Sequence, residues 1–509
     1  MNVFLMYRDR DTGPEERQPL HRSALIQDLE LETLFKAMAS GDGFLLEVAK
    51  ESVLASLREP EAIIYRQQIL SDCLRHPDIV WQMYGIAVQA IEKERKIWGG
   101  MFARYPDGLL RRSLEVLGIF VELLKLLRDT AAAQAAKFES EGFTRFFRML
   151  ADELSDEYLA KLKGHLRQLE FRKGVLMTAE FGKGNKGTNY ILRKPTNTKQ
   201  TWIDQLQIWM QRLTSKEASA YVYEIPDRDE AGFRALSELR ARGIGHVAAA
   251  LAQSTDHVLS FFTTLRLELG FYVACLNLQD RLAKKGEPIC FPEPLPMGTA
   301  VFSSRGLYDV CLSLNLGGRA VGNDIAGNGK LLLMITGANR GGKSTFLRGA
   351  GLAQLMMQCG MFVPAESHRA DVRAGVFTHF KREEDAAMNS GKLDEELNRM
   401  NSVIDRIRPG SMVLLNESFA STNEREGSEI ARQIVRALLE TGVKVFYVTH
   451  MFDLAQGFYR RGMDTALFLR AERLADGRRT FRLMEGEPLP TSYGEDLYAR
   501  IFGDDRKTK

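Results

Sequence analysis

A chain of 509 residues is long enough for roughly two to four domains, because single hydrophobic cores stop growing at about 250–300 residues. The hydrophobic fraction of 45% and the charged fraction of 27% are ordinary for a soluble globular protein, and a net charge of +3 does not by itself require a nucleic-acid partner. The five cysteines form no CxxC pair, and the first apolar run is too short for a signal peptide. We therefore expect a cytoplasmic protein that has neither a zinc site nor a disulfide framework and that does not cross a membrane.

The first half of the chain has a predominantly helical pattern. Residues 1–28 are polar and rich in arginine, which predicts a loosely ordered amino-terminal lead. Apolar residues then recur at helical spacing, which predicts a helical core domain over residues 29–170 and long helices over residues 206–290. The uncharged stretch 349–365 contains glycines, glutamines and a proline, so we expect a buried helix there and not a membrane span.

Residues 171–205 interrupt the helical pattern. Two short β-prone runs flank a turn of glycine, lysine and asparagine, which is typical of a hairpin. Between Arg167 and Lys199, eight lysines and arginines stand against two glutamates, a local excess of +6. We interpret this segment as a basic β-hairpin, resembling a clamp, that is inserted between long helices. The alternative is a solvated hairpin whose lysines only protect an exposed strand edge from pairing.

Residues 296–509 follow a proline-rich break and alternate apolar runs with helical patterns. The apolar runs are LLLMI (331–335), MVLL (412–415), VKVFYVT (443–449) and TALFLR (465–470). This alternation predicts an α/β domain with a mostly parallel, buried sheet. The fold class that we expect is α/β, with a carboxy-terminal nucleotide-binding domain preceded by an all-α region that carries the small β-hairpin.

The stretch ITGANRGGKSTFLRG, residues 335–349, contains the phosphate-loop pattern Gly337-x4-Gly342-Lys343-Ser344. Glycines let backbone N–H groups converge on phosphates, the lysine reaches the β- and γ-phosphates, and the serine hydroxyl binds Mg²⁺. A buried strand precedes the loop, and a helix follows with its amino terminus directed at the anion. We therefore expect ATP and Mg²⁺ as cofactors, and we expect the nucleotide to be bound by Gly337, Asn339, Gly341, Gly342, Lys343, Ser344 and Thr345.

Two further strands end in polar residues. Asn416 and Glu417 follow MVLL, and His450 follows VKVFYVT. Asn416 would hold Mg²⁺ less tightly than an aspartate, whereas Glu417 would orient or deprotonate the attacking water. His450 would sense the γ-phosphate. The alternatives are that Glu417 caps the next helix and that His450 is structural. The candidate catalytic residues are Lys343, Glu417 and His450, and the candidate metal ligands are Ser344 and Asn416.

A further helix is predicted after Ser390 and Gly391. A Ser-Gly pair at a helix start is either an ordinary N-cap or a second anion site, and the residues alone favour the N-cap. The expected apolar face of this helix comprises Leu393, Leu397, Met400, Ile404 and Ile407.

Together these motifs resemble those of the MutS mismatch-repair family, whose ATPase is of the ABC type. TGANRGGKST is similar to the phosphate loop of that family, and SGKLDEELNRM stands where the family has its signature stretch. VLLNESFASTNEREG corresponds to the Walker B strand with its following loop, and VTHMFDLA to the histidine switch. The likeness covers about 200 residues of the chain; upstream, only the layout of helices with an inserted hairpin resembles the lever and clamp of the family.

The resemblance implies an ATP-gated dimeric clamp on duplex, mismatched or branched DNA that acts in DNA repair or recombination. It implies a homodimer in which Ser390 reaches the partner's γ-phosphate. It also makes the hairpin the tip that contacts the DNA backbone, through Lys183, Lys186, Arg193 and Lys194.

The chain also departs from the family. Asn416 replaces the Walker B aspartate, and no segment corresponds to the mismatch-reading domain or to the carboxy-terminal helix-turn-helix dimerisation element. We therefore expect no strong selectivity for mismatches. Two other functions stay open: a ribosome- or RNA-remodelling ATPase, and a slow nucleotide-gated interaction module. The hairpin does not separate DNA from RNA, because phosphate contacts carry no sequence information.

Overall fold

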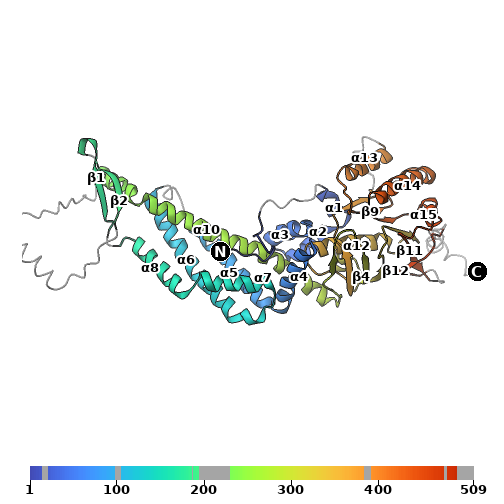
Figure 1. Cartoon of the computed structure of the whole chain (residues 1–509), viewed down its shortest axis with the longest axis horizontal. Helices are drawn as coiled ribbons and strands as arrows, with labels where there is room; N and C mark the ends of the chain where they lie inside the picture. Colours follow the sequence, from blue (N-terminus) through green and yellow to red (C-terminus); the bar gives the residue numbers. More distant parts are fainter. Residues whose placement is uncertain are drawn as a thin grey trace, which may run out of the picture. The chain divides into compact units, whose positions relative to one another are not determined.

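The computed structural model describes residues 1–13, 21–97, 105–172, 174–185, 187–193, 230–382, 391–474 and 478–489. The chain divides into two compact units (Figure 1). The first consists of Met1, Gly85–Ala132 and Met149–Thr263. The second consists of Asn2–Tyr84, Ala133–Arg148 and Thr264–Lys509.

The first unit is built from helices and one hairpin, as the pattern predicts. Phe120 and Phe262 pack with their ring centroids 5.5 Å apart, and Ile244 is fully buried in a second apolar cluster. The elements of the first unit are the end of α5 (Pro77–Lys96), most of α6 (Pro106–Gln134), the end of α7 (Glu141–Glu153), α8 (Asp156–Leu169), β1 (Met177–Phe181), the short helix η3 (Lys183–Asn185), β2 (Gly187–Leu192) and the first part of α10 (Glu230–Lys284).

Helix α10 contributes to both units. By length and composition, its part Glu238–Lys284 is apolar enough to cross a membrane, but 61% of the most apolar window is buried inside the protein. The second unit contains the other end of this helix, where Phe271 and Tyr272 are fully buried. Helix α10 is therefore a buried core helix and not a membrane span. Before α10 in the chain, the second unit also contains the starts of α5 and α7 and the helices α1 (Arg22–Asp28), α2 (Leu31–Ala39), α3 (Gly43–Leu54), α4 (Pro60–Arg75) and η2 (Ala135–Lys137).

The amino-terminal residues are ordered, so the expectation of a loosely ordered lead is wrong for residues 1–13. Leu5 is fully buried and Met6 nearly so. The carboxylate of Glu268 in α10 accepts the backbone N–H groups of Leu5 at 2.7 Å, Met6 at 3.1 Å and Thr12 at 2.7 Å. The composition of the segment does not predict this order, because the hydrogen bonds that hold the segment come from one buried carboxylate more than 250 residues away in the sequence.

A six-stranded sheet forms the centre of the second unit's nucleotide-binding part. Its strand order is β12-β11-β6-β10-β9-β8. The strands from β11 to β8 are parallel, and β12 pairs antiparallel at the edge. The predicted α/β fold with a mostly parallel, buried sheet is confirmed. The strands are β6 (Leu332–Gly337), β8 (Val376–Phe380), β9 (Met412–Asn416), β10 (Lys444–Val448), β11 (Ala466–Arg473) and β12 (Arg479–Glu485).

A smaller sheet and five helices complete this part. The smaller sheet has the order β3-β7-β4-β5. Its strands are β3 (Glu293–Leu295), β4 (Phe302–Leu307), β5 (Asn323–Ala326) and β7 (Ser367–Asp371). The helices are α11 (Val310–Asn315), α12 (Lys343–Gln358), α13 (Lys392–Ile404), α14 (Glu424–Glu440) and α15 (Phe452–Tyr459).

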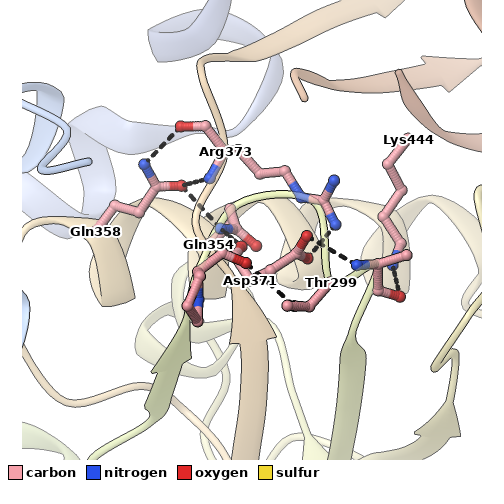
Figure 2. A network of polar contacts seen from close by, with 8 residues as sticks. Thr299, Gln354, Gln358, Asp371, Arg373 and Lys444 are labelled. Carbon is pink, nitrogen blue, oxygen red and sulfur yellow. Dashed lines mark hydrogen bonds and ion pairs between the residues drawn. The ribbon is translucent and has the colours of Figure 1, made fainter. Parts of the chain in front are cut away.

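A buried polar cluster lies at the amino-terminal end of β10 (Figure 2). Arg373 donates to the carboxylate of Asp371, and the Asp371 carboxylate also accepts the backbone N–H of Ala300 at 3.1 Å. The Lys444 ammonium donates to the carbonyl oxygen of Ala300 at 3.1 Å. Gln358, at the end of α12, donates to the carbonyl oxygens of Leu57 and Arg373, each at 3.0 Å. The cluster thus connects the end of α12 to the segment before α4 and to the sheet.

Lys444 should make stability depend on pH. Burial, together with the positive charge of Arg373, lowers the pKa of Lys444 to about 7, although the carboxylate of Asp371 opposes the shift. Between this value and the ordinary lysine pKa of about 10.4, the unfolded chain binds more protons, so stability rises with pH by at most about 1.4 kcal/mol per pH unit. We expect the difference in thermal midpoint between wild type and Lys444→Met to grow in favour of wild type from pH 7 to pH 10. Lys137→Met is the control, because it removes an exposed charge; a constant difference would refute the prediction.

Candidate nucleotide-binding site

The phosphate loop connects β6 to the amino terminus of α12. Gly337 and Gly342 adopt φ angles of 103° and 90°, in the left-handed region that favours glycine. A Cβ atom at Gly341 would lie 2.6 Å from the Cβ of Ala471 in β11, and one at Gly342 would lie 3.2 Å from the carbonyl oxygen of Phe481 in β12. The edge hairpin β11–β12 therefore packs directly against the loop and leaves no room for side chains there.

The start of α12 suits an anion. Gly342 is its N-cap and offers no side-chain oxygen to the first backbone N–H groups. Those groups and the positive end of the helix dipole are what a phosphate needs. The Lys343 ammonium donates to the carbonyl oxygens of Gly337 at 2.9 Å and Ala338 at 3.0 Å. Burial lowers the pKa of Lys343 to about 8, although Glu417 opposes the shift, and a phosphate beside it would favour the charged form.

Ser344 and Asn416 meet at the same edge of the sheet. The Ser344 hydroxyl donates to Oδ1 of Asn416 at 2.9 Å. Asn416 ends β9, which is separated from the phosphate-loop strand β6 by β10. Two neighbouring oxygen atoms fit the preference of Mg²⁺ for oxygen ligands, but the pair brings no negative charge of its own.

Glu417 and His450 form a second polar pair at this edge. Oε1 of Glu417 lies 2.8 Å from Nε2 of His450, which follows β10, and both side chains are about one-third exposed. The hydrogen bond from His450 lowers the pKa of Glu417, and the charge of Lys343 acts in the same direction. Glu417 does not cap the following helix, because the N-cap of α14 is Asn423, whose side chain accepts from the backbone N–H of Glu426 at 3.0 Å. The capping alternative for Glu417 is therefore wrong.

Helix α13 differs from its predicted packing. Its N-cap is Gly391, and Ser390 lies outside the described residues. Leu397 and Ile404 are exposed, although both were expected on the apolar face. The residues that this helix buries are Glu396, Met400 and Val403. The spacing of apolar residues did not predict which residues α13 buries, because Glu396 is buried and its carboxylate accepts a hydrogen bond from Ser421.

The basic hairpin is present as β1 and β2. Lys183 is exposed in the turn between the strands. Arg193 is exposed just after β2, where its Nε donates to the hydroxyl of Thr178 at 3.1 Å. Lys186 and Lys194 lie outside the described residues.

Three residues around the turn after Glu417 were not singled out from the sequence. They are His379 in β8, Ser418 in the turn and Tyr447 in β10, and all three are buried. The Tyr447 hydroxyl donates to the carbonyl oxygen of Ser418 at 2.6 Å, and Nδ1 of His379 lies 2.8 Å from Oγ of Ser418. No local pattern indicates these contacts, because the residues come from three different strands or their ends.

The fold and this edge of the sheet define a P-loop nucleotide-binding domain. Family models match most of the chain: the MutS2 N-terminal domain over residues 58–285 and MutS domain V over residues 333–494. The DNA mismatch repair protein MutS of Thermotoga sp. (strain RQ2) is 37% identical over 137 residues, which are 27% of this chain and 17% of that protein. Endonuclease MutS2 of Lacticaseibacillus casei (strain BL23) is 32% identical over 188 residues, which are 36% of this chain and 23% of that protein.

The chain belongs to the MutS family and combines a MutS2-type amino-terminal part with MutS domain V. Because MutS domain V is an ABC-type ATPase domain, the carboxy-terminal part of the chain is an ATPase domain. The match to the MutS2 N-terminal domain begins at residue 58 and includes the hairpin, where the sequence alone indicated only a similar layout. The matches span between 17% and 23% of the length of these two relatives.

Proposed function

We propose that this protein is an ATP-dependent DNA-binding protein of the MutS type, which forms a homodimer and closes on duplex or branched DNA in the cytoplasm during repair or recombination. The observation that carries this proposal is the combination of a MutS domain V phosphate loop with a hairpin in a MutS2-type amino-terminal part, on which Lys183 and Arg193 are exposed. The names of the relatives, a mismatch repair protein and an endonuclease, support a DNA substrate.

Each polar residue at the edge of the sheet has a proposed role. Lys343 and the N–H groups of the phosphate loop bind the phosphates of ATP, and Ser344 and Asn416 hold Mg²⁺. Bound Mg²⁺ supplies positive charge that stabilises the reacting phosphates. Glu417 orients the attacking water. His450 holds the Glu417 carboxylate in place through their 2.8 Å contact. The loop residues Asn339 and Thr345 complete the nucleotide-binding set.

The dimer is proposed because ABC-type sites are shared between two copies. Helix α13 begins at Lys392, directly after Gly391, so Ser390 lies at the start of this helix in sequence. We propose that the start of α13 in one copy faces the nucleotide of the other, with Ser390 at the γ-phosphate. In a closed two-fold dimer, each copy would then complete the site of its partner.

The hairpin provides the test of the DNA-binding part. Replacing Lys183, Lys186, Arg193 and Lys194 together by glutamine should weaken DNA binding about equally for all sequences. Each lost phosphate contact should also reduce the slope of log affinity against log salt by about 0.9. The measurement is a salt titration of fluorescence anisotropy with labelled duplex in the presence of ATP and Mg²⁺.

The control removes four exposed basic residues of the second unit, namely Lys36, Arg58, Lys137 and Arg436. Unchanged affinity and slope in the hairpin variant, or an equal loss in the control, would place the hairpin outside the DNA path. Homoduplex, mismatched duplex, branched DNA and structured RNA serve as competitors. Stronger competition by RNA than by any DNA would replace the proposal by an RNA-remodelling function.

A further inference from the structure

His379 lies between the turn after Glu417 and helix α13. Its position in β8 pairs in register with Leu415 in β9, two residues before Glu417. Nδ1 of its ring lies 2.8 Å from Oγ of Ser418, and Nε2 lies 3.0 Å from the carbonyl oxygen of Glu396 in α13. The ring also stacks on Phe419, at 5.4 Å between centroids and 19° between planes. One buried side chain thus contacts both elements.

The hydrogen-bond partners determine the protonation of His379. The Glu396 carbonyl oxygen can only accept, so Nε2 must carry the proton that is donated to it. Burial lowers the pKa of His379 to about 4, so the ring is neutral at physiological pH. Nδ1 is then an acceptor. The single proton of the Ser418 hydroxyl can be donated either to Nδ1, 2.8 Å away, or to the carbonyl oxygen of His379, 2.6 Å away. In His379, Nε2 therefore donates a hydrogen bond to α13, and Nδ1 is an acceptor that faces the turn.

The turn that this link holds has an unfavourable backbone conformation. Glu417 and Phe419 adopt φ angles of 53° and 64°, in the left-handed region that side chains other than glycine rarely occupy. Such residues persist where surrounding contacts determine them, and they cluster at functional sites. Ser418 and Phe419 are fully buried, and the Tyr447 hydroxyl holds the carbonyl oxygen of Ser418 at 2.6 Å.

Helix α13 contacts this turn a second time. The Glu396 carboxylate is buried and accepts the hydroxyl of Ser421 at 3.0 Å. The backbone of Glu396 contacts His379, while its side chain contacts the loop that follows Glu417. A shift of α13 would therefore move the backbone beside Glu417 through both contacts.

We propose that His379 is a positioning residue for ATP hydrolysis, which holds the turn that presents Glu417 and connects the placement of its carboxylate to helix α13. The inference rests on the proposed role of Glu417 and assigns His379 a role in orientation without contact to the nucleotide. A Glu417 carboxylate that is oriented less well would slow the chemical step while leaving the phosphate loop unchanged.

The test uses the full-length protein with His379→Phe, which keeps the stacked ring but removes both hydrogen bonds. We expect kcat for ATP hydrolysis to fall about tenfold or more, with KM for ATP within about twofold of wild type. His379→Asn keeps an acceptor for Ser418, and His379→Gln keeps a donor for Glu396. Each should recover part of kcat.

His368→Phe is the matched control. His368 is also buried, its Nδ1 lies 2.6 Å from Oγ of Ser304, and burial lowers its pKa to about 4, but it lies in β7 of the smaller sheet. A kcat of His379→Phe within twofold of wild type, a rise in KM without a fall in kcat, or an equal loss of kcat in His368→Phe would overturn the proposal.

Amide hydrogen exchange separates this inference from the proposed function, because it needs no hydrolysis. We expect faster exchange over residues 417–422 and in α13 for His379→Phe than for wild type. Unchanged exchange would show that the link does not hold the turn. If Glu417→Gln hydrolysed ATP at the wild-type rate, the catalytic assignment of Glu417 would be wrong, and the positioning role of His379 would be overturned with it. Faster exchange in His379→Phe would in that case show only that His379 holds the turn in place.

Discussion

Replacing Glu417 by glutamine should slow ATP hydrolysis by about two orders of magnitude or more, in the range found when a group that handles the attacking water is removed. The hydrogen bond from His450 lowers the pKa of Glu417, so the carboxylate is ionised at neutral pH and can orient water. Glutamine has almost the same shape but carries no charge and cannot take a proton. The measurement is steady-state phosphate release at saturating ATP and Mg²⁺.

Binding separates this loss from a general failure of the site. Glu417→Gln should retain ATP, as measured by binding of a fluorescent ATP analogue, because Lys343 and the phosphate loop are unchanged. Lys343→Ala should lose binding itself, since its ammonium lies within the loop, 2.9 Å from the carbonyl oxygen of Gly337. Hydrolysis at the wild-type rate in Glu417→Gln would remove that residue from the catalytic role.

Local motifs predicted the carboxy-terminal sheet and the grouping of polar residues with the phosphate loop at one edge of it. The strands are short apolar runs, and the carboxyl ends of neighbouring parallel strands meet at one edge. Asn416, which ends β9, and His450, which follows β10, could therefore be grouped with the phosphate loop on sequence grounds. The glycines of the loop were also predictable, because the motif itself demands them.

Contacts between residues distant in the sequence could not be predicted in this way. The amino-terminal segment is ordered by Glu268, and the turn after Glu417 is held by His379 and Glu396. In each case a polar residue is buried because a partner from another element satisfies it, whereas amphipathic spacing assigns polar residues to the surface. The exposed Leu397 and the buried Glu396 on α13 illustrate the same limit.

These contacts also affect how the site can work. At this edge of the sheet, the hairpin β11–β12 packs against the phosphate loop, whereas contacts from His379 and α13 hold the turn after Glu417. Different elements therefore support the loop and the turn. Nucleotide contacts made by the loop and contacts made at α13 can then change independently. In the proposed dimer, a partner copy that contacts α13 would act on the turn that carries Glu417 and not on the phosphate loop.

Replacing Asn416 by aspartate should lower the Mg²⁺ concentration at half-maximal ATPase activity by about tenfold, which corresponds to about 1.4 kcal/mol of binding free energy. The Ser344 hydroxyl donates to Oδ1 of Asn416 at 2.9 Å, so an aspartate there would place a charged oxygen where the metal is expected. Without Mg²⁺ the new carboxylate would lie next to Glu417 in the chain, and the repulsion between two like charges should lower the thermal midpoint. Mg²⁺ with ATP should restore the midpoint.

Asn423→Asp is the matched control for this change. It introduces the same charge at the start of α14, where the side chain accepts from the backbone N–H of Glu426, and aspartate caps a helix as well as asparagine does. The Mg²⁺ midpoint of this variant should equal that of wild type. An equal shift in both variants would indicate a general effect of surface charge, and no shift in Asn416→Asp would show that Asn416 does not lie beside the ion. A shift confined to Asn416→Asp would mean that the uncharged side chain at this position keeps Mg²⁺ binding weak, so that hydrolysis depends more steeply on Mg²⁺ in the wild-type protein.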